Sequence, residues 1–410
     1  MKKMKDSGIE WIGEIPQHWK LERLKFHAVL NPLVDTSDFE NEDEVSFVPM
    51  ENLKSGYHGT SIVSYSKVRK GYTQFNAGDI LIAKVTPCFE NGNIAIASDL
   101  IRDTGFGSTE INVIRCGDIS TKFLFYYMQN PKFIERGVSD MFGVAGLKRL
   151  VPEYIVSSFY PLPPDAEQQA IADYLDRKCG RIDAMISAKE KTNALLMELR
   201  QSTIYEAITK GLDPGIPMKD SGVEWIGKIP DDKAWTTVRL KHIVFMKSGE
   251  NITAHLIDKE GDYPVYGGNG LRGYNSSYTH DGDYILIGRQ GALCGNVHLV
   301  QGRFWASEHA IVVTVLNNNN ITWLSYLFQS MNLNQYSESA AQPGISVEKV
   351  GNLYIPCPNT NIQQQIADYL DHKCAEIDSV IAANITTIDK LKEYRQSIIY
   401  EAVTGKTEVA

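Results

Sequence analysis

The feature that most constrains this 410-residue chain is an internal repeat. The block MKDSGIEWIGEIP, Met4 to Pro16, returns as MKDSGVEWIGKIP at Met218 to Pro230, identical at eleven of thirteen positions and offset by 214. A second block, starting IADYLD at Ile171, returns at Ile366, offset by 195. Because the offsets differ by 19, the segment between the blocks is shorter in the second copy. The two blocks, which form the frame of each copy, repeat, whereas the insert between them does not. The copies therefore share a structural task, while their inserts perform two related but different ones.

The second block predicts a long helix in each copy. From about 167 to 210 there is no proline and Gly180 is the only glycine. Apolar residues recur there at helical spacing, namely Ile171, Leu175, Ile182, Ile186, Leu196 and Leu199. The second copy keeps this stripe from about 362 to 403, with Ile366, Leu370, Ile377, Ile381, Ile388, Leu391 and Ile398.

Some 40 residues make a helix of roughly 60 Å, which is unstable alone unless its stripe is covered. We expect the helix of the other copy to cover it. Polar stripe residues, here Lys189, Asn193 and Asn384, are typical of seam positions that fix register. Two ordinary core helices in separate domains are the alternative interpretation.

The ends of the helices suggest a closed arrangement. Proline-rich segments precede both helices, and the run from Gly211 to Gly215 ends the first one. The chain ends soon after Gly405, about where a further MKDSG block would begin. We therefore expect the first MKDSG block, with its Trp11, to pack on the second helix, and Trp225 likewise to anchor its own block to a helix, giving a circular, pseudo-two-fold arrangement.

The inserts are predicted to be independent globular domains of short strands and turns. Each contains a Gly-Asp strand, Gly78 to Lys84 or Gly282 to Arg289, followed by a Gly-Asn pair and then by Thr109-Glu110 or Ser307-Glu308. Polar side chains cluster in the turns around this skeleton. Arg, Lys, Asn and Gln can read base edges in the DNA major groove, and Ser and Thr can bind bases or phosphates.

The candidate DNA-binding residues form two sets. Those of the first insert are Lys67, Arg69, Lys70, Lys84, Thr86, Asn91, Asn93, Ser108 and Thr109. Those of the second insert are Asn269, Arg272, Arg289, Gln290, Asn296, Ser307 and His309. Any one of them alone is more simply explained as a solvated loop residue, so the hypothesis depends on the set.

Other function classes find little support. The run GNGLRG at Gly268 has the dinucleotide-binding spacing but is not followed by a helix pattern, so it is interpreted as a recognition loop presenting Asn269 and Arg272. Asp165 with Asp176 and Lys178 only imitates a metal nuclease, and the run Asn31 to Val34 falls short of an amino-methyltransferase motif. No histidine or cysteine spacing fits a metal site. We expect no catalytic residues and no bound metal.

The six cysteines form no C-x-x-C pair, and no apolar run has the length of a signal peptide or a membrane span. These features predict a cytoplasmic protein outside the membrane. The net charge of −9 disfavours binding of DNA through a general positive field.

Two variable domains, each followed by a repeated long helix, with W-I-G-x-I-P near each start and P-L-P-P-x-x-E-Q-Q before the first helix, resemble the specificity subunit of type I restriction-modification enzymes. The resemblance implies that each variable domain is a target recognition domain for one half of a split DNA sequence. It also implies that the helices form a spacer and dock two methyltransferase subunits. Two departures occur: Asn361-Ile362 replaces Ala166-Glu167, which weakens a shared role for Glu167, and Trp235 lies two residues later than Trp19 predicts.

The resulting hypothesis is an α+β protein with two globular mixed α/β target recognition domains separated by two long antiparallel coiled-coil helices in pseudo-two-fold symmetry. The expected segments are 1–166 (first recognition domain), 167–213 (central helix), 214–361 (second recognition domain) and 362–410 (C-terminal helix). A heptad inserted near Lys191 should lengthen the unspecified spacer of the target and leave the half-sites unchanged. A coiled-coil scaffold that binds only protein is the alternative.

The resemblance implies a non-catalytic subunit whose partners are double-stranded DNA, two methyltransferase subunits and restriction or translocase subunits. S-adenosylmethionine, ATP and Mg²⁺ are then expected on the partner subunits, with none of them bound by this chain. Because every expected segment is net acidic, we expect weak DNA binding by the chain alone and tight binding once partners supply positive charge.

Overall fold

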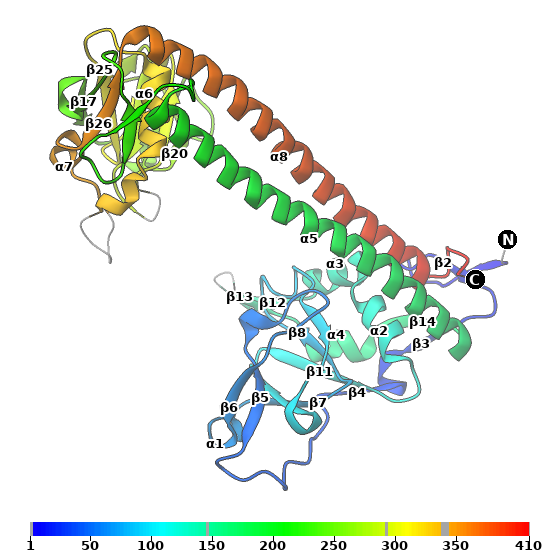
Figure 1. Cartoon of the computed structure of the whole chain (residues 1–410). Coiled ribbons are helices and arrows are strands. Elements are labelled where there is room, and N and C mark those ends of the chain that lie inside the picture. The colour runs from blue at the N-terminus through cyan, green and yellow to red at the C-terminus, as the bar shows by residue number, and fades with distance from the viewer. Residues whose placement is uncertain (1–2, 145–146, 292–293, 338–343, 410) are drawn as a thin grey trace. The chain divides into compact units, whose positions relative to one another are not determined.

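The structure is a computed structural model that describes residues 3–144, 147–291, 294–337 and 344–409. Its contacts divide into two compact units. Unit 1 comprises Met1–Lys189 with Thr386–Ala410, and unit 2 comprises Glu190–Ile385. Two long helices, α5 (Asp165–Lys210) and α8 (Thr360–Val403), each contribute one half to each unit (Figure 1). Both helices match the predicted apolar stripes, 167–210 and 362–403, within two residues, and they end before the expected segment ends at 213 and 410.

Unit 1 contains two four-stranded sheets. Their orders are β6-β5-β10-β7 and β4-β11-β8-β9, with only β5 and β10 parallel. The strands are β4 (Ala28–Leu30), β5 (Glu44–Val48), β6 (Ser61–Ser64), β7 (Thr73–Asn76), β8 (Ile80–Ala83), β9 (Ile94–Ile96), β10 (Thr104–Gly107) and β11 (Ile111–Cys116). Two-stranded pairs join β1 (Met4–Asp6) to β2 (Glu14–Pro16), β3 (Lys20–Arg23) to β14 (Phe159–Leu162), and β12 (Phe142–Val144) to β13 (Leu147–Arg149). The short helices are α1 (Tyr65–Val68), α2 (Thr121–Met128), α3 (Pro131–Ser139) and α4 (Pro152–Ser157).

Unit 2 repeats this topology although its insert has a different sequence. The sheet orders are β20-β19-β24-β21 and β18-β25-β22-β23, again with one parallel pair, β19 and β24. The strands are β18 (Val244–Ser248), β19 (Tyr263–Gly267), β20 (Gly270–Asn275), β21 (His280–Asp281), β22 (Tyr284–Gly288), β23 (Val297–Val300), β24 (Arg303–Ala306) and β25 (Ala310–Val315). The pairs β15 (Met218–Asp220) with β16 (Lys228–Pro230) and β17 (Trp235–Arg239) with β26 (Tyr354–Pro358) match those of unit 1. The helices are α6 (Ile321–Ser330) and α7 (Val347–Gly351).

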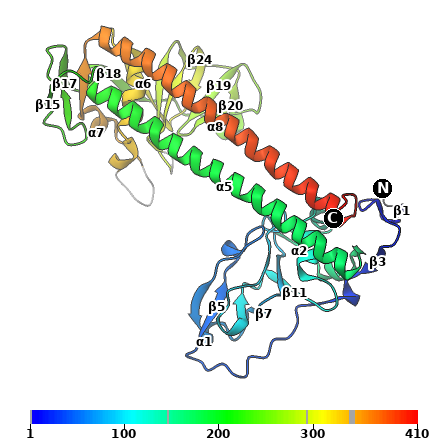
Figure 2. The ribbon, with the colours of Figure 1, turned by 45° about the vertical axis from the view of Figure 1, so that its right-hand side comes forward.

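The two long helices run antiparallel within each unit, as Figure 2 lets the reader follow. In unit 1 the Nε of Arg395 lies 3.0 Å from Oδ1 of Asp183, and in unit 2 the Nε of Arg200 lies 3.0 Å from Oδ1 of Asp378. Both residues of the second pair lie 195 positions from a residue of the first, with donor and acceptor helices exchanged. The contact therefore obeys the pseudo-two-fold relation that the repeat predicts.

Two of the three predicted polar residues, Asn193 and Asn384, meet in the seam between the helices. Within unit 2, Nδ2 of Asn384 donates to Oδ1 of Asn193 over 2.8 Å. The predicted stripe is correct for Ile171 and Ile398, which are buried. It is wrong for Leu199, whose side chain is 53% exposed because the covered seam of a two-helix contact is narrower than a core-facing stripe.

A buried glutamine fixes each insert to its helix. In unit 1, Oε1 of Gln168 accepts from the backbone N–H of Ser120, the residue before α2, and its Nε2 donates to the carbonyl of Pro163. Gln363 makes the same two bonds in unit 2, with the N–H of Asn320 and the carbonyl of Pro358. Both glutamines are about 1% exposed. The repeated frame thus sets where α2 and α6 begin.

The MKDSG blocks pack against the long helices as the repeat predicts, but the indole of Trp225 donates to the carbonyl of Tyr354 on β26 over 3.0 Å, and the Trp11 ring lies 6.1 Å from the Tyr127 ring on α2. In unit 1, Ile12, Ile15 and Trp19 share a core with the C-terminal turns of α8, and the carbonyl of Ile12 accepts from Nζ of Lys406 over 3.2 Å. In unit 2, the hydroxyl of Tyr205 on α5 donates to the carbonyl of Trp225 over 3.1 Å.

The glycines after the two helices explain the shifted tryptophan. Gly405 and Gly211 both have positive φ, +71° and +73°. A Cβ on Gly405 would lie 2.9 Å from the Trp19 ring, and one on Gly211 would lie 3.0 Å from the Trp235 ring. Trp235 therefore occupies the same place as Trp19 despite its two-residue displacement. Glu167 holds Trp19 through a 3.1 Å bond from Nε1, a contact that Ile362 cannot make.

Candidate nucleic-acid interface

Four predicted residues of unit 2 meet around one pocket. Asn269, Arg272, Gln290 and His309 line a hollow of about 430 Å³ together with Gly268, Gly270, Leu271 and Gly291. They come from three segments: the β19–β20 hairpin, the residues after β22 and the residues before β25. The pocket therefore brings together side chains that are up to 40 positions apart.

Close backbone packing builds this pocket. A Cβ on Gly268 would lie 3.1 Å from the carbonyl oxygens of both Gln290 and His309. The N–H of Arg289 donates to the carbonyl of His309 over 2.9 Å, which joins the other two segments. The GNGLRG run is thus a β-hairpin whose glycines permit this approach, and the dinucleotide interpretation fails because no helix follows it.

Most polar side chains in the pocket are already hydrogen bonded. Nδ2 of Asn296 donates to Oδ1 of Asn269 over 3.1 Å. Nδ1 of His309 lies 3.2 Å from Oε1 of Gln290, and its Nε2 lies 3.1 Å from Oε1 of Glu308. These contacts orient the amides and the imidazole at the rim.

Two remaining predictions for unit 2 differ in accessibility. Arg289 is half-buried beside the pocket. Ser307 is fully buried, and its N–H donates to the carbonyl of Tyr266 over 2.9 Å, so its position is a packing position of the strand end. Contact between Ser307 and DNA would need movement of the surrounding loops.

In unit 1, Lys84 and Thr86 lie beside the β12–β13 hairpin. The N–H of Lys84 donates to the carbonyl of Glu110 over 3.0 Å, and Oγ1 of Thr86 accepts from the N–H of Lys148 over 3.0 Å. Arg149 makes two bonds to the Glu110 carboxylate, of 2.9 and 2.8 Å. The Arg149 bonds, together with the charges of Arg149 and Lys84, lower the pKa of Glu110 and keep it ionised.

Sequence reasoning missed the basic residues of this hairpin. Lys148 and Arg149 are exposed on β13, and the apolar side chains of Phe142 and Leu147 in the hairpin are 72% and 62% exposed. No repeat signal marks them, because unit 2 has no matching hairpin within its described residues.

The other predictions for unit 1 are dispersed. Ser108 accepts from the N–H of Glu110 through its Oγ, and Thr109 is exposed in the same turn. Asn91 is exposed, whereas Asn93 is 8% exposed and belongs to the packed turn after β8. Lys67, Arg69 and Lys70 are exposed on and after α1, which borders the β6-β5-β10-β7 sheet at the far end of unit 1 from β12 and β13 in Figure 1.

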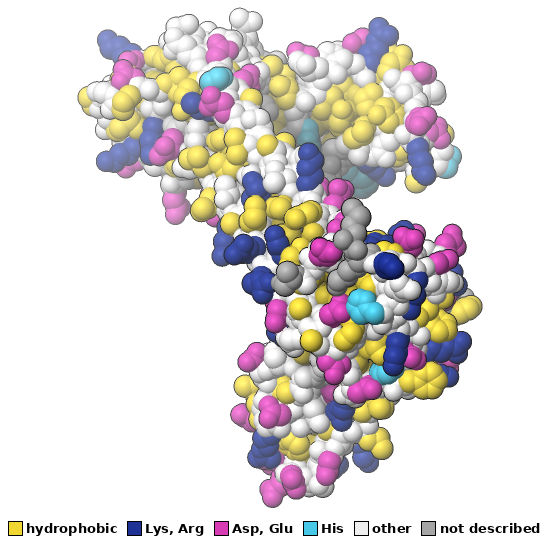
Figure 3. All heavy atoms as spheres, turned by 90° about the vertical axis from the view of Figure 1, so that its right-hand side faces the viewer, with side chains coloured by type: hydrophobic (Ala, Val, Ile, Leu, Met, Phe, Trp, Pro, Cys, Tyr) yellow, Lys and Arg dark blue, Asp and Glu magenta, His cyan; other side chains and the backbone are white. Residues whose placement is uncertain are grey.

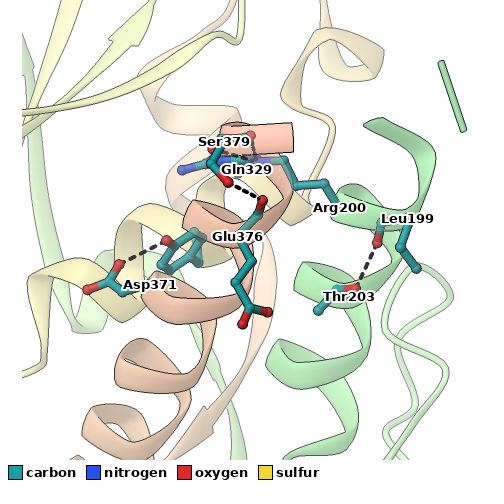
Figure 4. Close-up of polar contacts among 9 residues, drawn as sticks. Leu199, Arg200, Thr203, Gln329, Asp371, Glu376 and Ser379 are labelled. Carbon is teal, nitrogen blue, oxygen red and sulfur yellow. Dashed lines mark hydrogen bonds and ion pairs between the residues drawn. The ribbon is translucent and has the colours of Figure 1, made fainter. Parts of the chain in front are cut away.

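A second feature that sequence reasoning missed is a pair of equivalent polar pockets. In unit 1, a pocket of about 510 Å³ is bordered by Asn91, Gln129 and Arg395, and Nη1 of Arg395 donates to Oε1 of Gln129 over 3.1 Å. In unit 2, a pocket of about 300 Å³ is bordered by Asn296 and Gln329, and Arg200 points toward Gln329 (Figure 4). The repeated Arg-Gln-Ser triplet on each helix was the available signal.

Charged side chains of both signs occur on the surface, as the 41 Lys and Arg and the 50 Asp and Glu residues of the sequence lead one to expect. On the face seen in Figure 3, Lys and Arg side chains are interspersed with Asp and Glu. Among the described residues, no group of three or more His, Cys, Asp or Glu side chains is placed to hold a metal ion. No helix in the described part of the chain has the length and apolar composition to cross a membrane.

Comparison with known proteins gives consistent relatives. Residues 232–387 match a family model described as the type I restriction modification DNA specificity domain. The EcoprrI specificity subunit of Escherichia coli is 43% identical over 157 residues, which are 37% of this chain and 38% of that protein. The EcoAI specificity subunit of Escherichia coli is 40% identical over 163 residues, which are 38% of this chain and 27% of that protein. The matched segments thus span well under half of these relatives.

The fold also has a solved counterpart. A chain from a structure described as the structural basis underlying complex assembly and conformational transition of the type I R-M system aligns with a TM-score of 0.71. The alignment covers 96% of this chain and 99% of the other at 17% identity. This similarity confirms the predicted fold class over nearly the whole chain.

Proposed function

Because the chain belongs to the family of type I restriction-modification specificity subunits, we propose that it is the DNA sequence-recognition subunit of such a complex. It binds a bipartite target, with one half-site for each recognition unit. The observation that carries this proposal is the contrast between the repeated architecture of the two units and the different side chains in the turns of their inserts. Both units have the same sheet orders and the same helix anchors, yet the equivalent turns present different side chains.

The repeated helices support docking of two identical partners. Several apolar side chains of α5 and α8 are about half exposed or more, which is typical of surfaces that another protein covers. Met185 and Val380 are 51% and 47% exposed, and Leu199 and Tyr394 are 53% and 52% exposed. The members of each pair are 195 positions apart, so one surface is offered twice. Two methyltransferase subunits are the partners proposed for it.

The chain itself performs no chemistry in this proposal. Methyl transfer from S-adenosylmethionine, and any ATP- and Mg²⁺-dependent steps, belong to the methyltransferase and restriction or translocase subunits. The purified chain, incubated with duplex DNA and S-adenosylmethionine or Mg²⁺, is expected to give no methylated or cleaved product. Turnover by the chain alone would contradict the proposal.

The direct test is to map methylated bases in cells that express this chain with its methyltransferase subunit. The expected result is one bipartite motif with two specified half-sites and an unspecified spacer. Exchange of the insert of unit 2 for that of a relative should change one half-site and preserve the other. A chain that supports methylation without any sequence motif would overturn the proposal.

A filter-binding assay separates this function from that of a protein-only scaffold. With partner subunits present, the complex should retain random-sequence duplex DNA with a strong salt dependence, since phosphate contacts dominate affinity. The chain alone should bind weakly, because its charges are mixed and its net charge is −9. If the chain were only a protein scaffold, adding it to the partner subunits would not change their binding of DNA.

A further inference from the structure

We propose that Arg272 reads a guanine in the half-site of unit 2 and that Gly267 positions it; this inference rests on the proposed function. Arg272 lies on β20, is exposed, and lines the 430 Å³ pocket. Among the residues that the structure describes, its guanidinium makes no hydrogen bond or ion pair. Its donors are therefore available to a ligand.

The neighbouring amide side chains, unlike Arg272, already have partners within the protein. The amide oxygen of Asn269 accepts from Asn296, and that of Gln290 faces His309. An adenine reader needs both atoms of an amide for a bidentate contact, and in these two side chains the oxygen is already engaged. A guanidinium presents two parallel N–H donors, which match O6 and N7 of guanine in the major groove. Guanine is thus the base that suits Arg272, the pocket side chain whose donors have no partner among the described residues.

The position of the Arg272 stem is set by a missing side chain. Gly267 ends β19 and pairs across the hairpin turn with Gly270, two residues before Arg272 on β20. A Cβ at position 267 would lie 2.4 Å from Cδ and 3.1 Å from Cγ of Arg272. Only glycine lets the stem lie against the strand. Because that stem is flexible, Gly267→Ala should displace the guanidinium without removing its charge, and so separates positioning from electrostatics.

The experiment maps methylation motifs in cells that express the methyltransferase partner with the wild-type chain or with the variants Arg272→Ala, Arg272→Lys and Gly267→Ala. Lys259→Ala is the matched control, because it removes one exposed positive charge of the same unit outside the pocket. Thermal unfolding of each purified chain checks folding. Arg272→Ala removes only an exposed side chain and is expected to unfold like the wild type.

The expected result is relaxation at a single guanine of one half-site, with the other half-site and the spacer unchanged. Preference for guanine there should fall roughly ten- to a hundredfold in Arg272→Ala. Arg272→Lys and Gly267→Ala should relax the same position, and Lys259→Ala should relax none.

Three outcomes separate the possible failures. An unchanged motif in Arg272→Ala overturns the inference. Uniform weakening at all positions with a smaller salt dependence overturns it too, since this identifies a phosphate contact. If the wild-type chain yields no bipartite motif, the proposed function fails instead.

Discussion

At the residue scale, buried polar groups with fixed partners are the most informative. Gln168 and Gln363 lie at equivalent places and satisfy one N–H and one carbonyl each. A buried backbone N–H or carbonyl without a hydrogen-bond partner costs free energy. Each glutamine therefore contributes to stability through these two hydrogen bonds as well as through its packing. The two glutamines have the offset of the repeated helices, 195 positions, but neither was singled out from the sequence, because nothing in the spacing indicated what they bind.

We expect Gln168→Ala to destabilise unit 1 by about 1–3 kcal/mol, because it leaves the Ser120 N–H and the Pro163 carbonyl without this partner. Gln363→Ala should have a similar effect on unit 2. Gln169→Ala is the control, since Gln169 is exposed and its side chain bonds to Asp173 within its own helix. Denaturant unfolding measures the differences. Equal stabilities of Gln168→Ala and Gln169→Ala would contradict the anchoring role.

His298 gives a pH dependence in unit 2. Burial lowers its pKa below the ordinary value of 6.5. Above that value both the folded and unfolded states are neutral at this site, and below it the unfolded state gains the proton first. Stability should therefore fall as pH drops from about 7 through 6. His298→Gln should reduce the difference between the unfolding temperatures at pH 7.5 and pH 5.5. His242→Gln serves as the control because His242 is exposed, and an undiminished difference in His298→Gln would refute the prediction.

At the element scale, helices were easier to predict than strands. The range of α5 followed from the absence of proline and from apolar spacing, which are local signals. In the inserts, only the strands near Gly78 and Gly282 were recognised. The remaining pairings are non-local, such as β5 beside β10, where Gly105 lies opposite Ser46. Short apolar runs do not specify such partners, so the shared topology of the units was not accessible from sequence.

Only part of the candidate site was predicted correctly, because contacts between segments far apart in the sequence also decide which turn residues are exposed. Asn269, Arg272, Gln290 and His309 were selected as turn residues, and the fold places them together. Ser307 was selected by the same criterion, but it is buried, and the hydrogen bond from its N–H to the carbonyl of Tyr266 holds its turn against β19. Turn chemistry thus identifies polar loop residues, whereas burial depends on loops far away in sequence.

The Asn193–Asn384 pair should fix the register of the helix pair in unit 2. Replacing both by leucine should raise the unfolding temperature, since the buried apolar surface increases, while permitting other alignments or oligomers. Size-exclusion chromatography with light scattering should then show mixed species. The control is replacement of exposed Leu195 by asparagine, which should leave a single species. A stabilised double variant that remains homogeneous would show that register is set elsewhere.

At the whole-molecule scale, the duplication makes one chain equivalent to two copies of a single design. Unit 1 is completed by the last turns of α8, which return from the other end of the chain, whereas unit 2 is the continuous segment that begins with the last turns of α5. This arrangement explains why the frame is nearly invariant while the inserts vary. A change in the length of either helix affects both units, whereas a change in a recognition turn affects one.

The antiparallel pairing sharpens the spacer prediction. A heptad inserted only after Lys191 would move α5 out of register with α8, so a matched heptad is needed after Thr386 on the facing helix. Together they add about 10.5 Å of helix, or about three base pairs at roughly 3.4 Å each. Methylation mapping should return the same half-sites with a spacer longer by about that amount. Insertion into α5 alone is the control and should lower complex yield, and an unchanged spacer in the matched variant would mean that the helices do not set the distance between half-sites.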